Sequence, residues 1–334
     1  PSQATKRVGV GVACMVKTVG VGKNVPESAG AIVELDAQGR GKVLTGYCDM
    51  GQGANPMLAG LAAQELGLPV ERIDVLLPDT GLSPAAGPTG GSRQTFIMGN
   101  AVINAARDLK NQLAYRAADA LGAEPADIAL AGDQLVDRAT GQALPLSALG
   151  ERFAVESRYH TPSTDPQPLL IESKWGTPEF RSRRTNWLYD FGTAISIVEV
   201  DTQTGETRLL KHIAVYDVGK ALNPAAIEGQ IHGAVAMMMG YALSEEFVVR
   251  DGINLTDSLH KCRLPTADQT PEVVSVVLEI PCADGPYGAK GFSEAPTVNV
   301  APAIINAIYD AVGVRITSLP ATRAKVLAAL AEAA

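Results

Sequence analysis

A plan of hairpin, glycine-rich corner and helix occurs twice in this chain of 334 residues, and it limits the fold more than any other feature. Residues 29–53 have the pattern of a strand, a turn, a second strand and a corner, and residues 54–67 follow with apolar side chains at helical spacing. Residues 193–224 repeat the plan and lead into a second apolar segment. The matching triplets are Glu34-Leu35-Asp36 with Glu199-Val200-Asp201, and Asp49-Met50-Gly51 with Asp217-Val218-Gly219.

Two such units predict an α+β fold of two similar lobes, each a mixed β-sheet with long helices on one face. Residues 99–109 and 301–311 add a further similarity, because both have a helical period. Residues 157–168 are polar and proline-rich and lack periodicity, so we place the boundary there, between lobes 1–156 and 157–334. A chance likeness between unrelated hairpin–helix units is the alternative.

Composition narrows the classes of function. A net charge of −8 repels nucleic acid, and an aromatic content of 5% leaves little surface for base stacking. The basic cluster RSRR at residues 181–184 is interpreted as a solvated loop or a subunit contact. The longest apolar stretch, which begins at Ala234, is too short to span a bilayer, and the first residues lack a signal-peptide pattern. We expect a cytoplasmic protein that binds neither nucleic acid nor membrane.

The cysteines and histidines do not predict a metal held by the protein. The four cysteines have no CxxC pair or repeated short spacing, which argues against a zinc site or a self-contained iron–sulfur cluster. None of the four histidines has a partner at metal-ligand spacing, and His232 is interpreted as a packing residue. Sequence therefore predicts no metal-ligating residue.

Three glycine-rich corners precede predicted helices, at residues 49–56, 85–100 and 285–297. Consecutive glycines permit backbone conformations closed to other residues, and N–H groups gathered at a helix start form an anion site. Lys290 is followed by Gly291, so no P-loop is present, and GVGVAC near the N-terminus lacks the context of a dinucleotide fingerprint. Each corner alone is typical of an ordinary turn, but three together indicate a large, anionic, polar cofactor.

With these motifs, the chain resembles the C-terminal half of the molybdopterin-binding subunit of the molybdenum hydroxylases, the xanthine dehydrogenase/aldehyde oxidoreductase family. GPTGGSRQTFIMGNAV is similar to the family's Gly-Gly-Ser-Arg-Gln segment, and DMGQG to its Gly-Gln-Gly corner. EGQIHGA resembles its helical Gly-Gln motif, and DGPYGAKGFSEAP its loop before the catalytic glutamate. The layout is most similar to the medium molybdopterin subunit of nicotinate dehydrogenase, in which the molybdenum protein is divided between two chains.

The resemblance implies roles for individual residues. Glu294 corresponds to the family's catalytic base. The family holds its metal through the pterin, so no protein ligand to molybdenum is implied. The family usually has Val-Gly before the base, whereas this chain has Phe292-Ser293, whose bulk would narrow the pocket or shift the base. The positions that correspond to cofactor-binding residues are Gly51, Gln52, Gly53, Gly90, Gly91, Ser92, Arg93, Gln94, Gln230, Lys290 and Gly291.

The reaction implied is oxidative hydroxylation of an N-heterocycle or an aldehyde at an sp2 carbon, with water as oxygen source, Glu294 as base and hydride transfer to molybdenum. We expect Glu294 to be buried beside its glycines, which would raise its basicity. The implied cofactor is molybdenum–molybdopterin, with the cytosine dinucleotide form favoured.

Partner chains are also implied. This chain has no cluster motif and no flavin fingerprint, so iron–sulfur clusters and FAD are expected on partner subunits. The family's Gly-Gly-Phe-Gly and Arg-Gly-Phe-Gly segments are not in these residues. A further chain is therefore expected to supply the first half of the molybdopterin-binding protein.

Two alternatives of other classes stay open. A non-catalytic subunit that holds the cofactor or assists assembly would result if the Phe292-Ser293 change abolished activity, although the presence of Glu294 argues against it. A nucleotide-binding transferase could use GPTGGSRQ as an anion nest, but the chain lacks a Walker lysine and a magnesium-binding acid pair.

Overall fold

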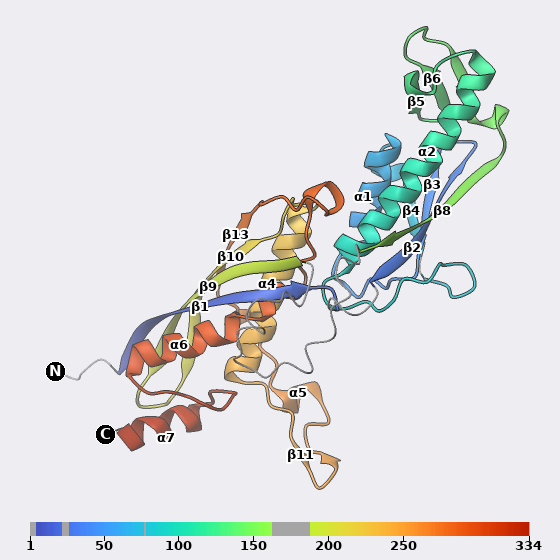
Figure 1. Ribbon diagram of the computed structural model, residues 1–334. Helices are drawn as coiled ribbons and strands as arrows, with labels where there is room; N and C mark the ends of the chain where they lie inside the picture. Colours follow the sequence, from blue (N-terminus) through green and yellow to red (C-terminus); the bar gives the residue numbers. More distant parts are fainter. Residues whose placement is uncertain (1–4, 22–26, 77, 162–187, 334) are drawn as a thin grey trace, which may run out of the picture. The chain divides into compact units, whose positions relative to one another are not determined.

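The chain forms two compact units (Figure 1). The computed structural model describes residues 5–21, 27–76, 78–161 and 188–333. Unit 1 consists of Pro1–Lys17, Tyr189–Glu279 and Phe292–Ala334, and unit 2 of Thr18–Leu188 and Ile280–Gly291. This division differs from continuous lobes 1–156 and 157–334, because the first strand pairs in the sheet of unit 1 and residues 280–291 pack in unit 2. Residues 162–168 of the expected boundary and the RSRR cluster lie outside the described residues.

Unit 2 is built on a four-stranded sheet of order β4-β3-β2-β8. Its strands are β2 (Ser28–Asp36), β3 (Gly41–Thr45), β4 (Ile73–Leu76) and β8 (Arg152–His160). β2 and β3 form an antiparallel hairpin, β4 runs parallel to β3, and β8 runs antiparallel to β2. Ala29, Ala31, Val33 and Leu35 alternate along β2 and are fully buried, as expected for a strand with one face under helices.

The helices of unit 2 are α1 (Ala54–Leu66) and α2 (Gly99–Leu121), which pack on each other and on the sheet (Figure 1). Each ends at a glycine in the left-handed conformation, Gly67 and Gly122, which is a common helix stop. A small antiparallel sheet packs beside α2 and consists of β5 (Ile128–Ala131), β6 (Gln134–Asp137) and β7 (Ala143–Pro145).

Unit 1 repeats this plan in a sheet of order β1-β9-β10-β13. Its strands are β1 (Lys6–Val19), β9 (Leu188–Asp201), β10 (Thr207–Asp217) and β13 (Glu272–Leu278). β9 and β10 form an antiparallel hairpin, and β13 runs parallel to β10, as β4 does to β3. The predicted repeat and the α+β class are therefore confirmed.

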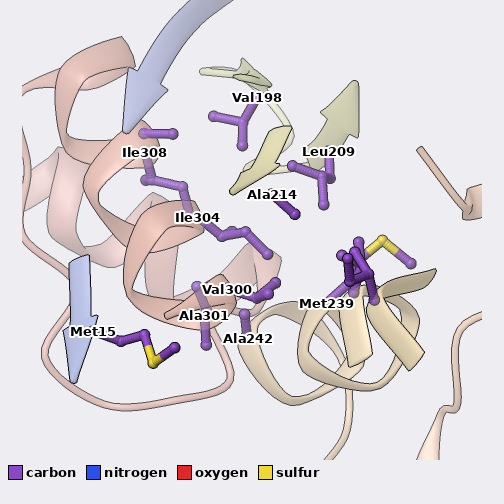
Figure 2. Packing of buried hydrophobic residues seen from close by; sticks show 14 of the residues in the cluster. Met15, Val198, Leu209, Ala214, Met239, Ala242, Val300, Ala301, Ile304 and Ile308 are labelled. Atoms are coloured by element: carbon purple, nitrogen blue, oxygen red, sulfur yellow. The ribbon is translucent and has the colours of Figure 1, made fainter. Parts of the chain in front are cut away.

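The core of unit 1 lies between this sheet and helices α4 (Pro224–Leu243) and α6 (Val300–Val312). Figure 2 shows Ile304 and Ile308 of α6, Met239 of α4 and Val198 of β9 directed into one apolar cluster. Side chains of this type stabilise a fold by roughly 1.5–3 kcal/mol each when they leave water.

Two glycines of β1 let α6 lie directly on the strand. A Cβ on Gly9 would be 2.3 Å from the carbonyl oxygen of Ala307, and a Cβ on Gly11 would be 2.1 Å from that of Ala303. The GVGVAC segment, which is not a dinucleotide fingerprint, is thus a surface for helix packing.

The remaining elements complete the two units. No described helix has the length and apolar character needed to cross a membrane. The short strands and helices of unit 1 are β11 (Val249–Arg250), β12 (Ile253–Asn254), α5 (Leu259–Cys262) and α7 (Arg323–Ala333). Single 3-10 turns are η1 (Val70–Arg72), η3 (Pro125–Asp127), η4 (Leu146–Ala148), η6 (Ala267–Gln269), η7 (Pro286–Gly288) and η8 (Ala295–Thr297).

Candidate functional site

The first glycine corner is organised by the carboxylate of Asp49. It accepts hydrogen bonds from the N–H groups of Gly51 at 2.9 Å, Gly53 at 3.3 Å and Asn55 at 2.9 Å. Burial acts to raise the pKa of Asp49, but the backbone hydrogen bonds outweigh it and hold the pKa below its usual range. Gly51 and Gly53 have φ of 104° and 81°, a region that favours glycine, so this corner requires both.

The side chains of Gln52 and Gln94 meet, and their contact joins the first corner to the second. Nε2 of Gln52 donates to Oε1 of Gln94 at 2.6 Å. Both amide groups also donate to the carbonyl of Cys48, at 3.0 and 3.1 Å. The structure therefore brings two candidate residues, 42 positions apart, into one polar cluster of unit 2.

The second corner turns sharply before α2. Gly91 and Ser92 have φ of 68° and 54°, and a left-handed serine is uncommon. The chain then enters η2 (Gln94–Met98), a π-helical turn that continues into α2, and such turns are frequent at functional sites. A Cβ on Gly90 would meet nothing within 4 Å, so there is open space beside the backbone here.

Arg93 is buried and its guanidinium is engaged within unit 2. Nε donates to Glu27 at 2.8 Å, and the terminal nitrogens donate to the carbonyls of Ala86 at 2.8 Å, Pro88 at 3.1 Å and Ser28 at 3.0 Å. The group also lies 5.2 Å from the centre of the Tyr47 ring. Arg93 thus holds the loop before the second corner in place. Arg93 can therefore affect a ligand only through the position of that loop.

The third glycine-rich segment packs against the second corner. A Cβ on Gly291 would lie 1.6 Å from the carbonyl oxygen of Ser92, so only glycine fits. Nδ2 of Asn100 donates to the carbonyl of Asp284 at 2.9 Å. We expected these glycines to approach a cofactor, but at Gly291 the close approach is to the protein's own backbone.

Tyr287 attaches the same loop to α1. Its hydroxyl donates to Glu65 at 2.8 Å, and Arg107 donates to the same carboxylate at 3.2 Å. Burial, together with the hydrogen bond to Glu65 and its charge, raises the pKa of Tyr287, so the hydroxyl stays protonated. Lys290 is buried in this loop. Sequence reasoning missed the Glu65–Tyr287 contact, because no local pattern links residues so far apart.

Glu294 lies in unit 1, at the start of η8. Its carboxylate is 3.0 Å from Nζ of Lys17, and the side chains of Lys17 and Glu294 are 14% and 45% exposed. The expectation of a buried Glu294 is therefore wrong for this chain, because the carboxylate is half-exposed and faces an ammonium group. Lys17 was also missed, because no local pattern links it to Glu294.

Phe292 does not act as expected from its bulk. Its ring is buried in the core of unit 1 and makes an edge contact with Tyr216, with ring centres 5.4 Å apart. The hydroxyl of Tyr216 donates to Asn299 at 2.6 Å. Phe292 therefore anchors the segment that carries Glu294 to the core.

Gln230 is half-buried on α4. Asn223 caps the start of this helix, because its side chain accepts from Ala226 N at 3.1 Å. α4 packs against η8, the turn that begins after Glu294. His232, interpreted as a packing residue, is exposed and lies 3.8 Å from Glu228. The buried histidine is His212, whose Nδ1 is 2.9 Å from the Ser196 hydroxyl.

Two further features could hold a ligand, namely a cluster of metal-binding side chains or a cavity. Among the described residues, no group of three or more histidines, cysteines or acidic residues is placed to hold a metal ion. A cavity of about 560 Å³ lies in unit 1, and none of the candidate residues lines it. Its charged groups include two internal ion pairs, Lys6–Glu199 and Arg323–Glu206.

Known proteins resemble this chain over nearly its whole length. Residues 1–271 match the family model of the molybdopterin cofactor-binding domain. The chain is 33% identical to an aldehyde oxidoreductase of Megalodesulfovibrio gigas over 98% of this chain and 33% of that protein. It is 32% identical to a xanthine dehydrogenase molybdenum-binding subunit of Escherichia coli over 96% of this chain and 42% of that protein. The structure of aldehyde oxidoreductase from Desulfovibrio gigas superposes with a TM-score of 0.81, at 31% identity, over 99% of this chain and 33% of that one.

The chain belongs to the molybdopterin cofactor-binding domain family of the molybdenum hydroxylases. It spans 33% to 42% of the length of these curated relatives. The described residues suit such a cofactor. The amide of Gln94, the backbone turn at Gly91 and Ser92 and the open space at Gly90 provide donors and room for phosphate and heterocycle edges. Both N–H groups of Gln52 are engaged with Gln94 and Cys48, so Gln52 orients the Gln94 amide.

Proposed function

We propose that this chain is the molybdopterin-binding subunit of a multi-subunit oxidoreductase that hydroxylates an N-heterocycle or an aldehyde at an sp2 carbon, with oxygen from water. The observation that carries the proposal is the contact of Gln52 with Gln94, next to the left-handed turn at Ser92, in a chain of this family. A surface of amide and backbone donors suits a large anionic cofactor better than an apolar ligand.

We assign cofactor binding to both corners and to α4. The amides of Gln94, oriented by Gln52, and of Gln230 would bind heterocycle edges and oxo groups, and the Lys290 ammonium would add positive charge. The remaining cofactor contacts are assigned to the backbone of Gly51, Gly53, Gly90, Gly91, Ser92 and Gly291. Arg93 acts by positioning, because its donors are engaged with Glu27 and backbone carbonyls. When bound, the molybdenum–pterin group would supply the acceptor for the two electrons removed from the substrate.

Glu294 is assigned the proton transfer. A carboxylate within reach of the attacking water would take its proton as the new carbon–oxygen bond forms, which typically accelerates such a step by 10²–10⁴-fold. Lys17, 3.0 Å away, would hold the carboxylate in one orientation before substrate binds.

Substrate class and partners rest on the relatives. These include an aldehyde oxidoreductase, a xanthine dehydrogenase subunit and a 6-hydroxypseudooxynicotine dehydrogenase subunit, so aldehydes and N-heterocycles are the classes to test. We further propose a cytosine dinucleotide form of the pterin, iron–sulfur and FAD partner subunits, and a chain that supplies the first half of the molybdopterin-binding protein.

The first experiment asks whether the natively purified complex contains the cofactor. Molybdenum would be measured by mass spectrometry of metals, the pterin dinucleotide released and identified, and the co-purifying chains sequenced. The proposal requires molybdenum and pterin in near-stoichiometric amounts. A complex without either would overturn it.

The second experiment separates catalysis from cofactor holding with Glu294→Gln in the same complex. Turnover of a panel of aldehydes and N-heterocycles would be followed with an artificial electron acceptor. We expect wild-type molybdenum content and a loss of turnover of about 10²–10⁴-fold. Glu124→Gln, an exposed position in unit 2, is the matched control. Unchanged turnover in Glu294→Gln would instead support a non-catalytic subunit that holds the cofactor.

A further inference from the structure

The first strand of unit 1 has an inverted pattern of side chains. Its inward residues, Gly9 and Gly11, are glycines pressed against α6, whereas its outward residues are valines. Val8, Val10 and Val12 are 59%, 48% and 51% exposed. A half-exposed strand normally places its apolar residues inward and polar residues outward. The valines of β1 therefore have the composition of a buried face without being buried.

Neighbouring strands continue this apolar surface. Ile213 of β10 is in register with Ile195 of β9 and with Val274 of β13, so the three lie side by side on the same face as the valines. We call this side of the unit 1 sheet, opposite α4 and α6, the outer face. Its exposed apolar residues include Val8, Val10, Val12, Phe191, Val276 and Leu278.

Two ion pairs lie on the outer face. Lys6 pairs with Glu199 at 2.7 Å, and Lys211 pairs with Glu272 at 2.8 Å. The register places Lys211 opposite Ile197, so these ion pairs stand beside the isoleucines and valines. Arg208, opposite Glu199 in the register, is exposed at the same end of the sheet. The valines and isoleucines therefore form the part of the face with low charge, and this part suits an apolar partner surface.

In unit 2, part of the corresponding face is covered by the chain itself. A Cβ on Gly30 of β2 would be 2.9 Å from Cβ of Pro84, and Gly30 N donates to the carbonyl of Ala85 at 3.0 Å. Gly30 alternates with the buried Ala29 and Ala31, so Pro84 lies on the side of the sheet opposite the helices. This covering loop comes directly after β4, the strand parallel to the hairpin.

In unit 1, the loop in the same topological position belongs to the other unit. That loop comes after β13 and consists of residues 280–291, which pack with unit 2. The plan that supplies a cover in unit 2 thus leaves the valines of β1 exposed within the described part of unit 1.

We propose that the outer face is the docking surface for a separate chain that corresponds to the part of the relatives this chain does not cover. This inference rests on the proposed function, in which such a chain completes the molybdopterin-binding protein. The curated relatives are much longer, since this chain spans only 33% to 42% of them. A permanent partner of that size explains a broad apolar face, because lasting interfaces resemble a protein core.

The test places charge on the outer face and follows assembly of the native complex. Val10→Asp combined with Val12→Asp should lower the yield of the co-purifying partner by at least tenfold. Val70→Asp, also at an exposed valine but in unit 2, should leave the yield unchanged. The partner counts only if its sequence matches the uncovered part of the relatives. Retention of that partner at wild-type yield by the double variant would overturn the proposal.

Photo-crosslinking keeps the test decisive if the double variant misfolds. A photoreactive amino acid at position 12 of the otherwise wild-type complex should attach to the partner chain, and one at position 70 should not. A crosslink from position 12 to this chain itself, or to a second copy, would overturn the proposal. Molybdenum content and Glu294→Gln turnover test the proposed function separately, so failure of the docking inference would leave those results unaffected.

Discussion

In unit 2, α1 and α2 cover one face of the sheet and Pro84 covers part of the other, whereas in unit 1 the helices cover one face and the valines of β1 stay exposed on the other. Both sheets nevertheless have the same hairpin and the same parallel third strand. The units therefore share the hairpin and the parallel third strand, and they differ in the fourth strand and in the path of the loop after the third.

The two units also differ in the exposure of their glutamate–cation pairs, Arg93–Glu27 and Lys17–Glu294. Arg93 and Glu27 in unit 2 are both buried, and they hold the covering loop on β2. Lys17 and Glu294 in unit 1 are closer to solvent, and they lie at the end of the loop that leaves unit 2. One pair supports the fold of its unit, and the proposed function assigns the other a part in proton transfer.

The largest effect should come from Arg93→Met. Removing one partner of a buried ion pair leaves Glu27 charged and without its partner, which typically costs about 3–5 kcal/mol. We expect that loss in the free energy of unfolding, measured by urea denaturation. Hydrogen exchange should show faster opening of β2 in unit 2 than in the wild type.

The control for this variant is Arg208→Met, at an exposed arginine of β10 in unit 1. It should change the free energy of unfolding by less than about 0.5 kcal/mol. A similarly small loss for Arg93→Met would mean that the covering loop is held by other contacts, and the contrast between the two pairs would disappear.

Local pattern predicted the elements that local forces determine. Alternation along β2 and β9, turns at Gly39 and Gly205 and helical spacing after both corners identified the hairpins and helices. The contact of Gln52 with Gln94 could also have been predicted, because both side chains lie at glycine-rich corners that suit the same kind of ligand.

The pairing of segments that are distant in sequence could not be predicted from local pattern. Nothing in the apolar pattern of β1 indicates that it pairs with β9 rather than with the hairpin next to it in sequence. Lys17 approaches Glu294 only because the first strand joins the later unit. Phe292 was judged by its bulk, whereas its direction, into the core beside Tyr216, depends on that same packing.

The two units should also differ in how their stability depends on pH. Burial lowers the pKa of His212 to about 4, against an ordinary value of 6.5. The unfolded chain therefore takes up a proton between these values while the folded chain does not, so stability falls as pH decreases from about 6.5 towards 4. The shift corresponds to a loss of about 2 kcal/mol at pH 5. Hydrogen exchange at pH 7 and pH 5 should show this loss in unit 1.

Unit 2 provides the internal control. Its described histidine, His160, is exposed on β8, so the same acid shift should affect unit 2 less. His212→Gln should remove most of the pH dependence in unit 1 and lower its stability at pH 7. Equal acid sensitivity of both units in the wild type would show that His212 does not determine it.

The smallest effect on stability is expected for the Lys17–Glu294 pair. Pairs that keep contact with solvent contribute about 0.2–1 kcal/mol in double-mutant cycles. A cycle of Lys17→Met, Glu294→Gln and the double variant, measured by urea denaturation of the full chain, should give a coupling in that range. Lys17→Arg should restore most of it, since the charge is kept.

A coupling above about 2 kcal/mol would place this pair with Arg93–Glu27 as a structural contact. A carboxylate held that firmly by a cation is a poor proton acceptor, so such a result would count against Glu294 as the base even if the cofactor binds as proposed.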